Sequence, residues 1–395
     1  MSDAAATPQA DPGRGSAGVL ELRGLTKRYV AGGPPAVDEL TLTVPAGEVM
    51  VLIGPSGCGK TTALKMINRL IEPSGGQILI DGHDVRERRA SELRRKIGYV
   101  IQQVGLLPHL TVEANVATVP RLLGWDRART RARVRELLEL IGMDPDEYGP
   151  RYPAQLSGGQ QQRVGLARAL GGDPPLMLMD EPFSAVDPIT RERLQNDFLR
   201  LHRAVPKTVV FVSHDIDEAV KMADRIAVMR EGRLVQYDPP AALLSSPVDD
   251  FVADFVGADR ALKSLSLRRI EEIDLLEPPV ATVGEPVAAV LERVACGSLT
   301  PVDGEVLVID GDSRPLDWLP LQRLDGEETV PARPAGGAEP VLDRLATLRN
   351  ALSALFEANA AYASVVDGDG RIVGLYGQAE IAAIFAPVDE VTSRG

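Results

Sequence analysis

Hydrophobic residues follow two alternating patterns over the first 257 residues of the chain. Short apolar runs rich in β-branched residues, such as residues 49–53 and 208–213, indicate buried strands. Between these runs, segments such as residues 158–170 place apolar residues three and four positions apart, which is the spacing of an amphipathic helix. Strands that alternate with helices predict a parallel sheet covered on both faces, and hence an α/β fold. The helical pattern over about residues 110–170 predicts an inserted helical lobe.

The pattern changes near residue 258, where the elements become shorter and are separated by sequences rich in Gly, Pro and Asp. Two halves are expected, over residues 273–328 and 340–388. The second half reads as helix (TLRNALSALFEAN), strand, DG turn, strand and helix (QAEIAAIF), and its weak similarity to the first half indicates an internal repeat. The sequence thus predicts a small α+β tail over residues 273–388, which follows a first domain over residues 19–257.

Composition places the chain among ordinary globular proteins and argues against several classes of function. With 44% hydrophobic and 25% charged residues, its 395 residues can bury a sizeable core in two or three domains. The formal net charge of −13 argues against a nucleic-acid partner, because binding to phosphate backbones rests on clustered Lys and Arg. No stretch reaches the roughly 18 apolar residues that a membrane span needs. Residues 1–18 are small and polar and lack the apolar core of a secretory signal, so a disordered leader and a cytoplasmic protein are expected.

The sequence GPSGCGKTT follows an apolar strand and precedes a helical pattern, as a phosphate-binding loop requires. Its glycines let backbone amides wrap a phosphate, and the start of the helix adds its positive dipole end. Lys60 is expected to reach the β- and γ-phosphates of ATP, and the Thr61 hydroxyl to coordinate Mg²⁺. Cys58 is either a reactive thiol at a helix N-terminus or filler in the loop. The predicted ATP contacts of this loop are Gly54, Pro55, Ser56, Gly57, Cys58, Gly59, Lys60, Thr61 and Thr62.

A second motif, LMLMDEP, supplies the catalytic complement of the phosphate loop. Its apolar residues predict a buried strand that presents Asp180 at its carboxyl end, where ligands of such sheets bind. Asp180 is expected to hold Mg²⁺. Glu181, the next residue, is expected to polarise the attacking water as a general base.

A third motif, LSGGQ, begins the helical pattern of residues 158–170. Ser157 can cap this helix, and the two glycines after it leave the first backbone amides bare, which makes a second anion site. Because the chain has one phosphate loop, we expect a head-to-tail dimer, in which each ATP lies between the phosphate loop of one chain and the LSGGQ of the other. The predicted ATP contacts from this motif are Ser157, Gly158, Gly159 and Gln160.

Together these motifs resemble the nucleotide-binding domain of ABC transporters, over residues 19–257. The resemblance implies that Tyr29 stacks on the adenine ring and that His214 contacts the γ-phosphate. It also implies that Gln102, with Gln103 as a one-residue alternative, senses Mg²⁺ and the γ-phosphate and moves with a transmembrane partner.

The kind of ABC protein is indicated by the segments that accompany the nucleotide-binding domain, which is called the motor below. Exporters usually fuse membrane helices to it, translation-acting members usually carry two motors, and DNA-repair members insert a long coiled coil. This chain has one phosphate loop, and Leu156 lies only 96 positions after Lys60. It therefore resembles a bacterial importer subunit, held at the cytoplasmic face of the membrane by permease subunits and working with a substrate-binding protein. Residues 184–187 resemble the loop that contacts the second motor.

Longer stretches resemble the motors of glycine betaine, carnitine and choline importers, among them IGYVIQQVGLLPHLTVEANVATVP and RYPAQLSGGQQQRVGLARAL. The resemblance implies that ATP hydrolysis drives the uptake of a quaternary ammonium osmoprotectant. Two alternatives remain open. One is a motor for another small solute, and the other is a soluble ABC ATPase that acts on an assembly unrelated to transport.

In that family the tail often carries a pair of CBS modules, and residues 340–388 resemble one, while the first half of the tail resembles a degenerate copy. Such modules hold the ribose of an adenine nucleotide with Thr or Ser and an acidic residue after the last strand. Here Gly377 and Glu380 stand at those places in the second half, and Pro320 and Arg323 in the first. The exchanged residues favour a dimerising or inhibitory role for the tail over nucleotide sensing.

Overall fold

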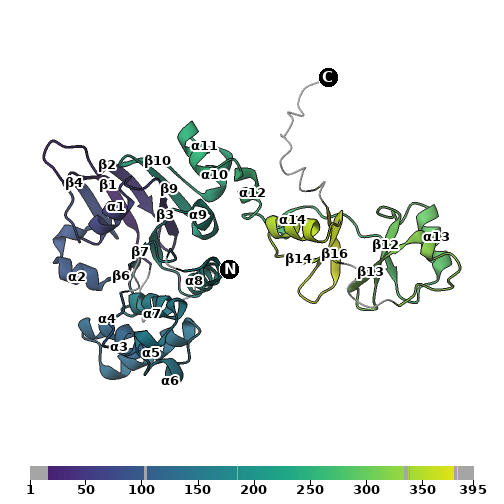
Figure 1. Ribbon diagram of the computed structural model, residues 1–395, viewed down its shortest axis with the longest axis horizontal. Coiled ribbons are helices and arrows are strands. Elements are labelled where there is room, and N and C mark those ends of the chain that lie inside the picture. The colour runs from purple at the N-terminus through teal and green to yellow at the C-terminus, as the bar shows by residue number, and fades with distance from the viewer. Residues whose placement is uncertain are drawn as a thin grey trace, which may run out of the picture. The chain divides into compact units, whose positions relative to one another are not determined.

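The computed structural model describes residues 17–101, 105–184, 186–332, 337, 339–377 and 380. The chain forms two compact units that divide between Gly257 and Ala258 (Figure 1). None of the described helices combines the length and the apolar character that a membrane span requires. The two units are described separately.

A six-stranded sheet forms the centre of the first unit, in the order β10-β9-β3-β8-β7-β6. Five of its strands run parallel, and β10 pairs antiparallel with β9 at one edge. β3 and β8 are buried at every position, as unbroken apolar runs predict for a sheet covered on both faces. The predicted α/β core is therefore confirmed. The strands are β3 (Val49–Ile53), β6 (Ile97–Val100), β7 (Leu176–Asp180), β8 (Thr208–Val212), β9 (Arg225–Arg230) and β10 (Arg233–Asp238).

The first unit also contains a four-stranded antiparallel sheet, in the order β2-β1-β4-β5, which the sequence pattern did not separate from the parallel one. In β1, Leu20 and Leu22 are buried while Arg23 is exposed, so one face packs inward, as is common in antiparallel sheets. Both leucines share a core cluster with Met50 of β3 and Leu64 of the first helix, so the two sheets have one hydrophobic core. The strands are β1 (Leu20–Lys27), β2 (Val37–Val44), β4 (Gly75–Ile80) and β5 (His83–Asp84).

The predicted helical lobe is present between β6 and β7, and Figure 1 shows it as a separate cluster of helices below the sheets. Asn115 is completely buried in the lobe, and its side chain bonds to the backbone amide of Leu107 (2.8 Å) and to the carbonyls of Leu107 (3.1 Å) and Leu110 (3.1 Å). These bonds fix the entry loop on α3. The elements are α3 (Val112–Val116), α4 (Thr118–Leu122), α5 (Arg127–Leu140), α6 (Pro145–Tyr148), η2 (Pro153–Gln155) and α7 (Gly158–Leu170).

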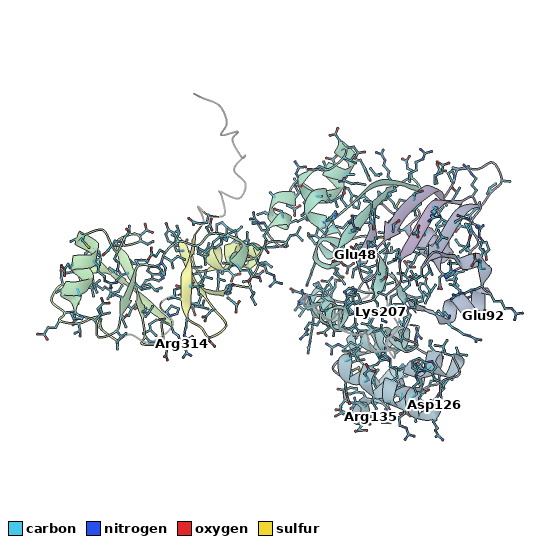
Figure 2. All side chains as sticks on the ribbon, turned by 180° about the vertical axis from the view of Figure 1, so that it is seen from behind. Glu48, Glu92, Asp126, Arg135, Lys207 and Arg314 are labelled. Atoms are coloured by element: carbon cyan, nitrogen blue, oxygen red, sulfur yellow. The ribbon has the colours of Figure 1, made fainter. Side chains whose placement is uncertain are left out.

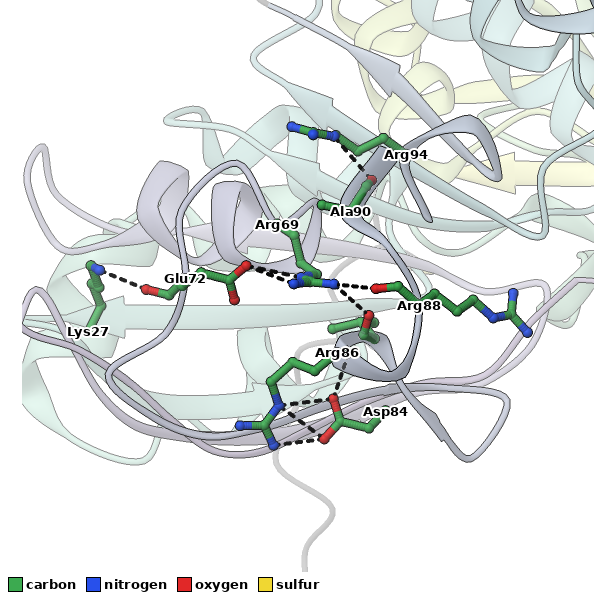
Figure 3. A network of polar contacts seen from close by, with 9 residues as sticks. Lys27, Arg69, Glu72, Asp84, Arg86, Arg88, Ala90 and Arg94 are labelled. Atoms are coloured by element: carbon green, nitrogen blue, oxygen red, sulfur yellow. Dashed lines mark hydrogen bonds and ion pairs between the residues drawn. The ribbon is translucent and has the colours of Figure 1, made fainter. Parts of the chain in front are cut away.

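Arg69 ties the end of α1 to the segment that follows β5, as Figure 3 shows. Its guanidinium donates to the carbonyls of Val85 (3.0 Å) and Arg88 (2.7 Å) and pairs with Glu72 (2.9 Å). Because α1 begins in the phosphate loop, these bonds hold the far end of the helix that carries the loop. The remaining helices of the unit are α1 (Lys60–Ile67), η1 (Val85–Glu87), α2 (Ala90–Arg95), α8 (Pro188–Ala204), α9 (Ile216–Met222), α10 (Pro240–Ser245) and α11 (Asp250–Val256).

The second unit contains two modules with the same order of strand, helix, strand and strand. In each module the first two strands pair in parallel and the last two pair antiparallel. Leu307 and Ile309 of the first module and Leu375 of the second form a cluster that joins the modules. The predicted helix QAEIAAIF lies, apart from Glu380, outside the described residues. The elements are α12 (Arg260–Ser264), η3 (Ile270–Glu272), β11 (Val280–Thr282), α13 (Val287–Ala295), β12 (Glu305–Ile309), β13 (Pro315–Pro320), η4 (Leu321–Arg323), β14 (Val341–Asp343), α14 (Leu348–Glu357), β15 (Tyr362–Val366) and β16 (Ile372–Gly377).

Candidate nucleotide-binding site

The carboxyl ends of three neighbouring strands bring the sequence motifs together. The phosphate loop follows β3, Asp180 ends β7, and His214 lies two residues after β8, which pairs in parallel with both of the other strands. Ligands of open α/β sheets bind at this edge. Strand topology therefore collects at one site residues that are far apart in the sequence.

Two glycines of the phosphate loop lie where no larger residue fits. Gly54 has φ 144°, and a Cβ added there would lie 2.1 Å from the carbonyl oxygen of Met229. Gly59 has φ 106°, and a Cβ there would lie 2.3 Å from the carbonyl oxygen of Ala36. Only glycine accepts both the conformation and the close approach. The loop is therefore held between β9 and the segment before β2.

Lys60 opens α1 and reaches back over the loop, with a side chain that is 7% exposed. Its Nζ donates to the carbonyl oxygens of Gly54 (2.6 Å) and Pro55 (3.0 Å) and lies 3.6 Å from Sγ of Cys58. The ammonium group is thus held over the loop that the motif assigns to phosphate binding. Cys58 is buried in the core cluster of the two sheets, and this burial favours a structural role in the loop over a role as a reactive thiol.

Thr61 and Asp180 form the candidate Mg²⁺ site. The Thr61 hydroxyl donates to Oδ1 of Asp180 over 3.2 Å. Burial raises the pKa of the Asp180 carboxyl, the hydrogen bond from Thr61 opposes this effect, and the neighbouring charge of Glu181 adds to it. Mg²⁺ is typically held by one or two protein oxygens together with water and substrate phosphates. The paired hydroxyl and carboxylate fit that ion, and its charge would favour the ionised form of Asp180.

Glu181 has φ 45°, a left-handed conformation that residues other than glycine seldom adopt. Its backbone amide donates to the Val212 carbonyl (3.0 Å), and its own carbonyl accepts from the Ser184 hydroxyl (2.9 Å), so the conformation is held from two sides. Its Oε2 lies 3.4 Å from Nδ1 of His214, whose side chain is 63% exposed. An accessible carboxylate beside an imidazole can orient a water and take its proton.

A buried polar network, which the motifs did not identify, holds the backbone next to His214 in place. Glu218 on α9 accepts hydrogen bonds from the hydroxyl of Ser213 and from Nε2 of Gln195 (3.0 Å) on α8. Burial raises the pKa of the Glu218 carboxyl, and both hydrogen bonds oppose this effect. The network fixes the residue before His214 to two helices. A carboxylate on a buried helix position is the one sequence signal that could have indicated it.

The LSGGQ motif forms the start of α7. The Ser157 hydroxyl accepts from the amide of Gln160 (3.3 Å), and the Gln160 side chain accepts from the amide of Ser157 (2.9 Å), which is a capping box. A Cβ on Gly158 would meet nothing within 4 Å, whereas one on Gly159 would lie 3.1 Å from Cγ2 of Thr190. The helix therefore presents an open, glycine-bearing N-terminus, where an anion can bind.

The remaining predicted residues fall into two groups. Tyr29 is 63% exposed, its hydroxyl lies 3.4 Å from Oγ1 of Thr62, and Nζ of Lys27 lies 5.4 Å from the ring centroid. An exposed aromatic ring beside the phosphate loop suits stacking on a base. Gln102 and Gln103, and Ala185 of the predicted dimer loop, lie outside the described residues.

A glycine-bearing loop between a strand and a helix, with a buried lysine and an acidic residue on a neighbouring strand, defines a P-loop nucleoside triphosphatase. The sequence matches the family described as ABC transporter over residues 37–184. The osmoprotectant import ATP-binding protein OsmV of Salmonella typhimurium is 47% identical, over 92% of this chain and 95% of that protein. The choline transport ATP-binding protein OpuBA of Bacillus subtilis is 42% identical, over 93% of this chain and 96% of that protein.

Among solved structures, cbiO1 of Clostridium perfringens, part of an ABC transporter complex, is similar with a TM-score of 0.55 and 25% identity, over 63% of this chain and 94% of that one. The chain belongs to the ATP-binding proteins of ABC transporters. It is an ATP hydrolase coupled to transport, so the predicted ABC-type α/β core, the family and the enzyme class are confirmed.

Proposed function

We propose that this chain hydrolyses ATP to power an importer of quaternary ammonium osmoprotectants, such as glycine betaine, choline or carnitine. The observation that carries the proposal is the extent of the similarity. The relatives named for osmoprotectant import and choline transport match more than nine-tenths of the chain, so the likeness includes the second unit as well as the ATPase. A motor for an unrelated solute would need only the first unit to be similar.

The residues of the site divide the work of hydrolysis. Lys60 and the loop amides bind the β- and γ-phosphates, while Thr61 and Asp180 hold Mg²⁺, which neutralises phosphate charge when it is bound. Glu181 accepts the proton of the attacking water. His214 is within reach of that carboxylate (Nδ1 to Oε2, 3.4 Å) and contacts the γ-phosphate, so that release of phosphate changes its surroundings.

The complete site requires a second copy of the chain. Its α7 N-terminus, with the backbone amides after Ser157, binds the γ-phosphate held by the phosphate loop of the first copy. Gln102 links nucleotide state to the permease subunits, which hold the motor at the cytoplasmic face of the membrane. A substrate-binding protein delivers the solute. The net charge of −13 argues against a nucleic-acid partner.

The test is ATP hydrolysis by the chain reconstituted in vesicles with permease subunits and a substrate-binding protein from the same organism. Glycine betaine, choline or carnitine should stimulate hydrolysis and be accumulated. Spermidine at the same concentration is the control and should do neither. The proposed substrate class is wrong if glycine betaine, choline and carnitine all fail to stimulate hydrolysis and a solute without a quaternary ammonium group does so. Failure to copurify with any membrane protein would favour the non-transport alternative.

A further inference from the structure

The helical lobe contains a second concave site that shares no residue with the nucleotide motifs. It is a pocket of about 730 Å³ bounded by α3, α4, α5 and α6. Its walls include the ring of Trp125, and the Arg129 guanidinium lies 3.8 Å from the centroid of that ring. Figure 2 labels two residues of this part of the lobe, Asp126, which caps the start of α5, and Arg135, which lies within α5.

The pocket is rich in guanidinium groups. Arg121, Arg127, Arg131 and Arg135 all line it. Arg135 forms a two-pronged ion pair with Asp146, at 2.6 and 3.0 Å. No ion pair joins any of the other three arginines to a carboxylate among the residues that the structure describes. The carboxylates in the lining are those of Asp146 and Glu113, so the pocket is cationic in a chain whose net charge is −13.

An unpaired polar group lies in the same wall. Thr130 lines the pocket and is 6% exposed, and its hydroxyl has no hydrogen-bond partner in the described part of the chain. A threonine on a helix usually bonds to the carbonyl four residues before it. A buried hydroxyl without a partner costs free energy, so its presence beside three exposed arginines that form no ion pair with any described residue points to a bound group that completes the site.

We propose that this pocket binds the phosphate group of an anionic small molecule or lipid. The planar guanidinium matches a phosphate with two parallel hydrogen bonds, and several arginines around one cavity with a hydroxyl donor form a typical phosphate site. Arg127 and Arg131, one turn apart on α5, hold the phosphate, and the Thr130 hydroxyl donates to it.

The pocket lies on a helix that packs against the LSGGQ helix. α5 packs against α7, the helix that begins with LSGGQ, and Nη1 of Arg163 on α7 donates to the carbonyl of Ile141 at the end of α5 (3.5 Å). The site does not depend on which solute is transported.

The test is titration calorimetry of the full chain as the Lys60→Ala variant without nucleotide, so that the phosphate loop binds weakly and no ATP competes for the pocket. The probes are inorganic phosphate, vesicles of phosphatidylglycerol, and vesicles of phosphatidylcholine as the neutral control. One or both anionic probes should bind, and an Arg127→Gln, Arg131→Gln double variant should weaken that binding at least tenfold. The matched control, Arg323→Gln with Arg349→Gln, removes two exposed arginines of the second unit and should leave it unchanged.

Thr130→Val separates a ligand from bulk charge, because it removes the hydroxyl and keeps shape and net charge. It should raise the melting temperature without ligand and weaken phosphate binding severalfold. Binding of inorganic phosphate alone identifies a soluble ligand, and binding of phosphatidylglycerol alone identifies a lipid headgroup. The proposal is overturned if neither probe binds, if the two double variants lose affinity equally, or if Thr130→Val binds as tightly as its parent.

Discussion

At the scale of single residues, Glu181 is the side chain on which hydrolysis should depend most. Glu181→Gln should keep ATP binding and slow turnover by about 10²–10⁴, the usual effect of a lost general base. The amide keeps the size of the carboxylate beside His214 but cannot accept the proton. Single-turnover ATPase assays on the assembled transporter measure the loss. Turnover near the unmodified rate would assign the base elsewhere, and Lys60→Ala should instead weaken nucleotide binding itself.

Gly59 should tolerate no side chain, because its φ is 106° and a Cβ would approach the Ala36 carbonyl to 2.3 Å. Gly59→Ala should lower the free energy of unfolding of the first unit by roughly 1–3 kcal/mol and weaken ATP binding. Gly82 is the control, since its φ is 75° but a Cβ there would meet nothing within 4 Å. Calorimetric melting of both variants separates close contact from backbone strain, and equal losses would contradict the role of the contact.

Glu218 should make the stability of the first unit depend on pH. Its folded pKa is raised by burial, so the ionised carboxylate costs stability above that pKa and the cost disappears as pH falls through it. Glu218→Gln removes the titration. The unmodified protein should therefore gain stability relative to this variant as pH falls from about 8 toward the unfolded glutamate value of about 4.3. Melting temperatures over this range test the sign, and a constant difference would contradict it.

Sequence motifs identify the residues whose positions follow from a common order of strands. Thr61 and Asp180 meet through one strand order that βαβ units make common, so their contact was predictable. The Glu218 network was not, because it joins two helices whose relative position depends on packing of the whole sheet. The left-handed conformation of Glu181 also follows from its contacts with β8 and Ser184, and no local sequence pattern specifies it.

At the scale of elements, the N-terminus of α7 should act across the interface between two chains. In the Glu181→Gln background, ATP should produce a dimer, and ADP a monomer, because α7 completes the nucleotide site of the other copy. Ser157→Arg should abolish the dimer and leave ATP binding to one chain intact, since the side chain fills the open helix end. Size-exclusion chromatography with light scattering gives the mass. A dimer of the Ser157→Arg variant would contradict the head-to-tail arrangement.

The two sheets of the first unit show what periodicity can and cannot specify. Unbroken apolar runs identified β3, β7 and β8 as buried parallel strands, because covering both faces leaves no place for polar residues. The alternation of buried and exposed residues in β1 was available in the sequence. The sequence did not show which strands pair with β1, because its partners β2 and β4 are determined by tertiary packing.

At the scale of the whole molecule, two units with separate cores should have separable functions. The division lies between Gly257 and Ala258, and the core clusters of the second unit draw all their residues from beyond that point. The sequence placed this change of pattern near residue 258. It could not give the pairing of the modules, because the residues that join them, such as Leu307 and Leu375, look like ordinary strand residues.

Removal of residues 258–395 should therefore leave ATP hydrolysis in the assembled transporter intact and change only its regulation. Every residue assigned to nucleotide chemistry lies between Tyr29 and His214, within the first unit. Loss of ATPase activity by a truncated chain that is soluble and folded would contradict this expectation.

We expect residues 258–395 alone to bind adenine nucleotides weakly or not at all, because residues that would hold a ribose are missing from them. The resemblance of residues 340–388 to a CBS module puts the ribose-binding Thr or Ser at Gly377, which has no hydroxyl and whose backbone amide bonds to Oε2 of Glu380 (3.1 Å). Pro320 and Arg323, at the equivalent places in the first module, supply neither a hydroxyl nor a carboxylate to hold a ribose. Calorimetry of this fragment with AMP, ATP and cyclic di-AMP is the measurement. Micromolar binding of any of the three would mean that the ribose is held by other residues and that the tail is a nucleotide sensor.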